Sequence, residues 1–251
     1  MKEMSFMEHL EEFRTRLIRV LGILVISFCI TYNFSSEIAE FLLVPVRTAL
    51  GGTAGKIVFT GLMDKVMAEL QIAFWSCIFL ASPFWFREAW LFIKPGLYEA
   101  EVRAIRPFIT VGFLLFLAGV AFGYYVVFPL TIPIMMNVGV QGVDAMLNLP
   151  DYLLLASKVL VFLGILFQLP NVMLILGFMG VVTKYSLRSW RRYMAVFFAV
   201  AAAILTPPDI FSMMCVWIPM MILYEIGILA VAFVVHPYLK RKVEAENQLT
   251  L

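Results

Sequence analysis

Six long apolar runs, separated by short charged segments, constrain the fold of this chain more than any other feature. They cover residues 17–34, 66–86, 107–129, 153–176, 193–205 and 210–235. A helix needs roughly 20 apolar residues to cross about 30 Å of hydrocarbon, and it satisfies its own backbone polar groups there. With 63% hydrophobic and 14% charged residues, the chain is too apolar for a soluble domain. The sequence therefore predicts an all-α polytopic membrane protein, a single domain over residues 1–251 with six transmembrane helices.

The Lys and Arg residues lie mostly on one side of these predicted spans. They cluster around the start of the first span, in segments 87–106 and 183–192, and in the tail 236–251; the others are Arg47, Lys56, Lys65 and Lys158. Short cytoplasmic loops carry an excess of Lys and Arg. We therefore expect both ends and the two basic loops to be cytoplasmic (N-in and C-in). Segments 35–65 and 130–152 would then form caps on the periplasmic side.

The outer segments and the fifth span depart from a simple helical hairpin. The stretch IAEFLLVPV in the first cap is too short to span, and we expect Pro45 to break it. The second cap is rich in Gly and Pro, which favours an irregular structure. The fifth run, about 13 residues, covers only roughly 20 Å as a helix. This helix is shorter than the hydrocarbon layer. Either the membrane thins locally and flanking residues snorkel, or the helix packs passively behind its neighbours.

Three polar positions within or next to the apolar runs need an explanation, because polar groups at membrane depth require a partner. For Gln168 and Glu225 we favour a functional or inter-subunit role, with a simple interhelical hydrogen bond as the alternative. Asp209 directly precedes the sixth run, where a carboxylate caps a helix and meets the positive end of its dipole.

The segment before the first span has the pattern of an amphipathic helix. Ser5 and Glu8 have the spacing of a capping box. The apolar residues then fall at helical spacing on one face: Phe6, Leu10, Phe13 and Leu17. We expect residues 1–16 to form a cytoplasmic interfacial helix, after which the chain turns into the first span.

Carboxylates on the predicted cytoplasmic face suggest a cationic ligand. Glu12 precedes Arg16 by four residues, and Glu99 and Glu101 stand beside Arg103 in the first inner loop. A guanidinium suits such a site best, because it engages a carboxylate bidentately and lysine cannot. The alternative is that these acids only balance neighbouring arginines at the surface.

Several longer strings of the chain resemble the TatC family, the multispanning receptor subunit of the twin-arginine (Sec-independent) protein translocase. The match covers nearly the whole chain, and its most specific pieces occur in the family's order: HLEEFRTRL, ASPFWFREAWLFIKPGLYEAEVR, FGYYVVFPL, GILFQLP, LTPPDIFS and IPMMILYEIG. The resemblance implies a glove-shaped receptor with six spans, N-in and C-in, of which the fifth and sixth are short.

The resemblance also implies a function. Such a receptor, in the bacterial cytoplasmic (inner) membrane, binds the twin-arginine signal peptides of folded proteins at its cytoplasmic face. Its partners are TatA- and TatB-type single-span subunits, further copies of itself and membrane lipids, but no nucleic acid. Export is driven by the proton-motive force, and neither a cofactor nor an enzymatic activity is expected.

The family's motifs also imply roles for individual residues of this chain. Glu12 and Glu101 match the acidic positions that bind the arginine pair. Other positions associated with that site are matched by Arg14, Phe92 and Arg103. Pro45 matches a sensitive position of the outer cap, and Asp209 matches the acid after the double proline.

The fourth span departs from the family's pattern. Gln168 stands where the family commonly has a glutamate. Its amide carries no proton-linked charge but keeps a donor and an acceptor. A mechanism in which this site ionises is therefore disfavoured, whereas hydrogen bonding to a partner's transmembrane helix is compatible with it.

Two other classes of function compete with a receptor. A secondary transporter or channel would use Glu225 and Gln168 to line a path, but intramembrane charge is scarce and no internal repeat is evident. An intramembrane enzyme is disfavoured because no His, Ser or Cys lies in a plausible catalytic pairing. The three widely spaced cysteines and the two histidines at opposite ends suggest neither a disulfide framework nor a metal site.

Overall fold

The computed structural model describes residues 6–50, 56–58, 61, 63–96, 102, 107–137, 146–206 and 209–235. These residues are almost entirely helical, with two three-residue strands, so the predicted all-α class is confirmed. The chain divides into two compact units. Unit 1 comprises Met1–Gly96 and Leu117–Leu163, and unit 2 comprises Leu97–Phe116 and Gly164–Leu251.

Unit 1 begins with one long helix, α1 (Phe6–Asn33), followed by α2 (Ser35–Leu50) at an angle of 75°. The turn that we expected between an interfacial helix and the first span is absent, because α1 is continuous through both segments. No proline interrupts residues 6–33, and Gly22 is their single glycine. A backbone without a breaker therefore stays helical as its surroundings change from polar to apolar.

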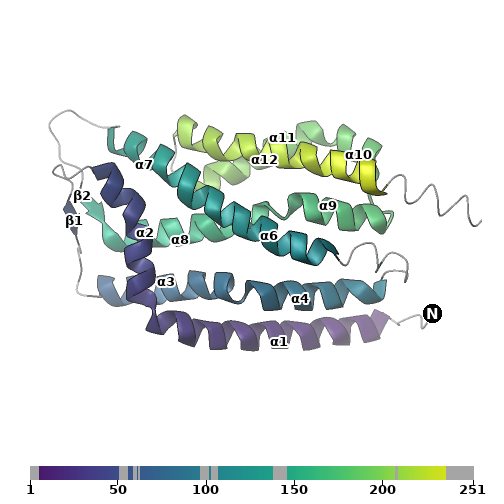
Figure 1. Ribbon diagram of the computed structural model, residues 1–251, viewed down its shortest axis with the longest axis horizontal. Helices are drawn as coiled ribbons and strands as arrows, with labels where there is room; N and C mark the ends of the chain where they lie inside the picture. The colour runs from purple at the N-terminus through teal and green to yellow at the C-terminus, as the bar shows by residue number, and fades with distance from the viewer. Residues whose placement is uncertain are drawn as a thin grey trace, which may run out of the picture. The chain divides into compact units, whose positions relative to one another are not determined.

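The second predicted span is a bent pair of helices. Helix α3 (Asp64–Leu80) and helix α4 (Ser82–Ile93) meet at Ala81 with a bend of 52°, and Pro83 occupies the first turn of α4. The start of the expected loop 87–106 is thus helical, ending in the short 3₁₀ turn η1 (Lys94–Gly96). Helix α1 packs along both α3 and α4 (Figure 1), and Thr31 Oγ donates to the Ala73 carbonyl at 2.8 Å.

The third span extends further than its apolar pattern indicated. Helix α6 (Pro107–Phe122) continues through a π-helical turn, η2 (Gly123–Val127), into α7 (Phe128–Asn137). The first residues of the expected irregular cap 130–152 are therefore helical. Two short parallel strands, β1 (Lys56–Val58) and β2 (Met146–Asn148), connect the two predicted cap segments.

Pro45 does not end α2, contrary to our expectation. A proline within a helix leaves the carbonyl four residues earlier without its usual donor, and here that carbonyl belongs to Phe41. Tyr124 supplies the missing hydrogen bond from its hydroxyl at 2.9 Å, and its ring stacks on that of Phe41. Tyr152 donates to the next carbonyl, Leu42, at 2.8 Å. Tyr124 thus compensates for the buried Pro45, which lies inside a helix that continues to Leu50.

Unit 2 is built around its last long helix, α12 (Ile210–Ala230), which continues as the π turn η3 (Val231–Val235). It packs against α9 (Leu169–Phe178), α10 (Lys184–Ser189) and α11 (Arg191–Leu205). Two aromatic donors on α12 fix these neighbours. Tyr224 Oη donates to the Leu187 carbonyl at 2.8 Å, and Trp217 Nε1 donates to the Ala195 carbonyl at 2.9 Å.

The fourth predicted span consists of two helices. Helix α8 (Leu149–Leu166) ends two residues before Gln168, and α9 begins directly after it with Pro170 in its first turn. Because proline has no N–H, it suits the start of a helix better than the interior. Gly180 ends the segment after α9 with a φ of 74°, a left-handed conformation that glycine adopts without strain.

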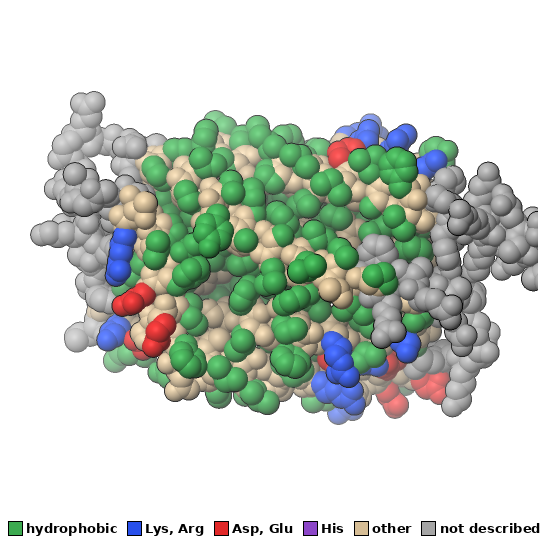
Figure 2. All heavy atoms as spheres, viewed as in Figure 1, with side chains coloured by type: hydrophobic (Ala, Val, Ile, Leu, Met, Phe, Trp, Pro, Cys, Tyr) green, Lys and Arg blue, Asp and Glu red, His purple; other side chains and the backbone are tan. Residues whose placement is uncertain are grey.

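Within the described residues, length and composition identify three membrane-spanning candidates: 109–134, 149–178 and 210–235. Counting the bent pairs α1–α2 and α3–α4 as one span each raises the number to five. The 210–235 candidate has 26 residues. The short sixth span implied by the resemblance is therefore wrong for this chain, because η3 continues α12 without a break. Helix α11, with 15 residues, is short as predicted. The face drawn in Figure 2 is covered mainly by hydrophobic side chains, as contact with lipid requires.

Candidate functional site

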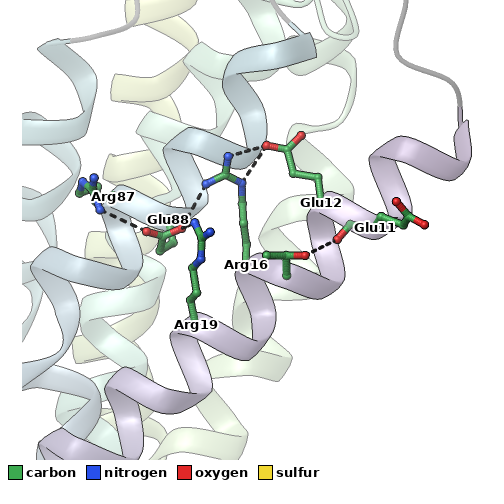
Figure 3. A network of polar contacts seen from close by, with 7 residues as sticks. Glu11, Glu12, Arg16, Arg19, Arg87 and Glu88 are labelled. Atoms are coloured by element: carbon green, nitrogen blue, oxygen red, sulfur yellow. Dashed lines mark hydrogen bonds and ion pairs between the residues drawn. The ribbon is translucent and has the colours of Figure 1, made fainter.

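A buried carboxylate, Glu88 on α4, lies at the centre of an ion network in unit 1. Only 6% of its side chain is exposed. Arg16 Nη1 donates to its Oε2 at 3.1 Å, and Arg87 Nη1 donates to its Oε1 at 3.2 Å. Arg19 Nη1 approaches Oε2 at 4.0 Å. Figure 3 shows how α1 supplies two of these arginines and α4 the third. Because an isolated buried charge is very costly, these three cations explain how Glu88 is accommodated.

Arg16 also connects the network to Glu12, one turn earlier on α1. Its Nε donates to Glu12 Oε1 at 3.0 Å, and its Nη2 contacts the same oxygen. The other oxygen, Oε2, is buried and has no hydrogen-bond partner among the described residues. The side chains of Arg16 and Glu12 are 17% and 19% exposed, so this pair lies at the edge of the buried region.

An aromatic cluster lies beside the network, between the same two helices. The ring of Phe92 on α4 stacks on His9 at a centroid distance of 4.6 Å and meets Phe13 at 5.4 Å. Both partners are on α1, within one turn of Glu12. The arrangement places an unpaired carboxylate oxygen next to a helix segment that carries aromatic rings. This combination suits a guanidinium, which donates to carboxylates from its edge and stacks on aromatic rings with its face.

The structure brings two of the predicted signal-peptide site residues together, and two others lie outside the described residues. Glu12 and Phe92 both lie in the α1–α4 contact region, whereas Arg14 is exposed on α1. Glu101 and Arg103, together with Glu99, lie outside the described residues.

Sequence reasoning missed Glu88 and the role of Arg16 between helices. The available signal was a single acid within the mainly apolar stretch ASPFWFREAWLF. We assigned this position to a loop, where an acid needs no partner.

Gln168 forms its hydrogen bonds within unit 2. Its Nε2 donates to the Gly112 carbonyl on α6 at 2.9 Å, and its Oε1 accepts a long contact from Asn171 at 3.5 Å. The residue is buried. The interhelical hydrogen bond that we considered as the alternative is therefore formed, and the amide is engaged with its own chain.

The remaining two polar positions also have partners. Glu225 Oε2 accepts from Arg191 Nη2 at 2.6 Å, an ion pair between α12 and α11 in which both side chains are about half exposed. Asp209 caps α12 as predicted, because its Oδ2 accepts from the Ser212 backbone N–H at 2.7 Å. Among the described residues, no group of three or more His, Cys, Asp or Glu side chains is placed to hold a metal ion.

Comparison with known proteins supports the resemblance seen in the sequence. A sequence profile described as Sec-independent protein translocase protein (TatC) matches residues 8–219. The chain belongs to the TatC family. It is 40% identical over 221 residues to the TatC of Magnetococcus marinus, covering 88% of this chain and 81% of the relative. The TatC of Desulforapulum autotrophicum is 36% identical over 224 residues, covering 89% and 83%.

Solved TatC structures have the same fold. A crystal structure of the twin-arginine translocase receptor TatC superposes with a TM-score of 0.80 at 29% identity, covering 90% of this chain and 99% of that one. A second, determined in the detergent DDM, gives a TM-score of 0.80 at 31% identity, covering 88% and 98%. As a TatC, this chain is a membrane component of protein translocation and not an enzyme. The transporter, channel and intramembrane-enzyme alternatives are thereby set aside.

Proposed function

We propose that this TatC binds the arginine pair of a twin-arginine signal peptide at the cytoplasmic face through Glu12 and Glu101. The observation that carries the proposal is the unpaired Glu12 Oε2, a buried acceptor beside the Phe92 cluster. A buried acceptor without a donor loses the hydrogen bonds that water would give it. An incoming guanidinium restores them with a charge-assisted bond. Arg14 and Arg103 would contribute to the same surface.

The proposal includes an orientation and a set of partners. Five spans are available from length and composition when each bent pair is counted once, and α11 would be the sixth. An N-in and C-in arrangement places Glu12 on the cytoplasmic side, where signal peptides arrive. Membrane-embedded single-span subunits of the TatA and TatB type, further copies of the chain and the proton-motive force would then complete export from the cytoplasmic membrane. Pro45 would act in the periplasmic cap, and Gln168 and Glu225 would be the intramembrane polar positions that contact such partner helices.

The test measures binding of a fluorescent twin-arginine signal peptide to the full-length protein in lipid nanodiscs. We expect Glu12→Gln and Glu101→Gln each to weaken binding by on the order of tenfold or more, because each removes a charge-assisted bond. A peptide in which both arginines are replaced by lysine should bind the unmodified protein weakly, because lysine lacks the planar fork.

Glu11→Gln is the matched control. It removes the same charge from an exposed neighbour on α1 and should leave the affinity unchanged. Equal affinities for Glu12→Gln, Glu101→Gln and the unmodified protein would contradict the proposed site. Equal binding of the arginine and lysine peptides would contradict guanidinium recognition.

A further inference from the structure

We propose that Glu88 is a positioning residue for this site: through Arg16, it holds Glu12 with one carboxylate oxygen free for the ligand's guanidinium. The inference rests on the proposed function, because it concerns how the Glu12 carboxylate is kept available. It assigns a role to a buried charge on α4 that the proposed binding step does not itself use.

The geometry of Arg16 is the first observation. A guanidinium commonly meets a carboxylate as a fork, with two nitrogens on two oxygens. Here Nε and Nη2 of Arg16 both contact Glu12 Oε1, and Oε2 receives no bond. The remaining terminal nitrogen, Nη1, is bonded to Glu88 at 3.1 Å. The orientation of Arg16 is therefore shared between two carboxylates on different helices (Figure 3).

The rigidity of Glu88 is the second observation. Its side chain is 6% exposed, and both of its oxygens are engaged: Oε1 by Arg87, and Oε2 by Arg16 with Arg19 at 4.0 Å. A carboxylate held from both sides is a fixed acceptor, because its lost rotamer freedom is already compensated by several bonds. Arg16 is thus anchored to α4 at one end of its guanidinium.

Removal of that anchor has a specific consequence. Without Glu88, Arg16 is free to rotate and to form the bidentate fork with Glu12, which occupies both oxygens of the carboxylate. The protein's own arginine then competes with the ligand's arginine for the same group. Glu88 acts against this competition without touching the ligand, and its effect depends on the presence of Arg16.

A double-mutant cycle tests this dependence with the nanodisc binding measurement and four proteins: the unmodified chain, Glu88→Met, Arg16→Met and the double variant. Methionine removes the charge in both cases; it has the length of glutamate and replaces the apolar stem of arginine. We expect Glu88→Met alone to weaken binding by on the order of tenfold, the value of a charge-assisted bond lost to competition. In the Arg16→Met background the same change should alter affinity by less than about twofold, because the competitor is absent.

Two results would overturn the inference. One is an unchanged affinity in Glu88→Met. The other is an equal loss in both backgrounds, which would show that Glu88 acts directly on the ligand or only on the fold. Thermal unfolding of each variant identifies a loss of fold. If Glu88→Met does not fold, Glu88→Gln replaces it, because the amide keeps an acceptor for Arg16; a partial loss of binding that disappears in Arg16→Met is then expected, and its persistence overturns the inference.

The outcome separates this inference from the proposed function. If Glu12→Gln removes binding and the Glu88 cycle shows no coupling, the signal-peptide site stands and only the positioning role fails. If Glu12→Gln binds normally, the proposed site itself fails, whatever Glu88 does.

Discussion

At the scale of single residues, the polar side chains of this protein are explained by their partners. Gln168 bonds to a carbonyl of α6, Glu225 pairs with Arg191, and Glu88 lies among three arginines. In each case a polar group in an apolar environment is compensated by a bond from another helix. Glu12 differs because one of its oxygens has no such compensation. That contrast supports the role in binding that we propose for Glu12.

Replacement of Gln168 by leucine should destabilise the protein. The variant keeps the size of the side chain but removes the bond to the Gly112 carbonyl and the contact with Asn171, which is already short of one partner. We expect a loss of about 1–2 kcal/mol in the free energy of unfolding, measured as a lower thermal midpoint in detergent. Val172→Leu, at an exposed position on the following helix α9, is the control. An unchanged midpoint for Gln168→Leu would show that the amide contributes nothing within the chain.

At the scale of helices, two local sequence signals gave incorrect boundaries. Charge at the start of α1 predicted a separate interfacial helix, and Pro45 predicted a break in α2. Neither occurred, because backbone continuity depends on hydrogen bonding and not on polarity. The tyrosines that satisfy the carbonyls before Pro45 are 83 and 110 residues away from their acceptors in sequence.

The contribution of Tyr124 should depend on Pro45. Tyr124→Phe removes the bond to the carbonyl that the proline leaves unpaired, and should cost about 1 kcal/mol of unfolding free energy. In a Pro45→Ala background, the backbone N–H of residue 45 supplies that bond, so the same tyrosine change should cost clearly less. Thermal unfolding of the four proteins measures the coupling. Equal losses in both backgrounds would mean that the hydroxyl does not compensate for the proline.

At the scale of the whole molecule, the family assignment gives the class of function and the charge distribution predicts the orientation. Five candidate spans, together with the 15-residue α11, make the proposed six. Helix α11 covers only about 22 Å, less than the hydrocarbon thickness. Spanning would then require thinning of the membrane around it or snorkelling of its first two residues, Arg191 and Arg192.

Thiol labelling tests the proposed orientation. The native cysteines Cys29, Cys77 and Cys215 are free and are first replaced by serine or alanine. Single cysteines are then introduced at two exposed serines, as Ser36→Cys on α2 and Ser189→Cys on α10. A membrane-impermeant maleimide added outside spheroplasts should label Ser36→Cys and spare Ser189→Cys, because positive charge retains the 183–192 segment inside. Inverted vesicles should give the opposite pattern, and labelling of both from one side would refute the orientation.

The sequence by itself determined the helical membrane class, the approximate positions of the apolar runs, the short fifth helix, the cap at Asp209 and the resemblance to the TatC family. These depend on local composition and on short motifs, which a single chain displays directly. Only the tertiary structure decided which charges meet. Glu88 and Arg16 are 72 residues apart, and nothing in their own segments indicates that α1 and α4 pack together and bury one against the other. The free oxygen of Glu12 is a consequence of that packing, because it is left over when Arg16 divides its bonds between two helices.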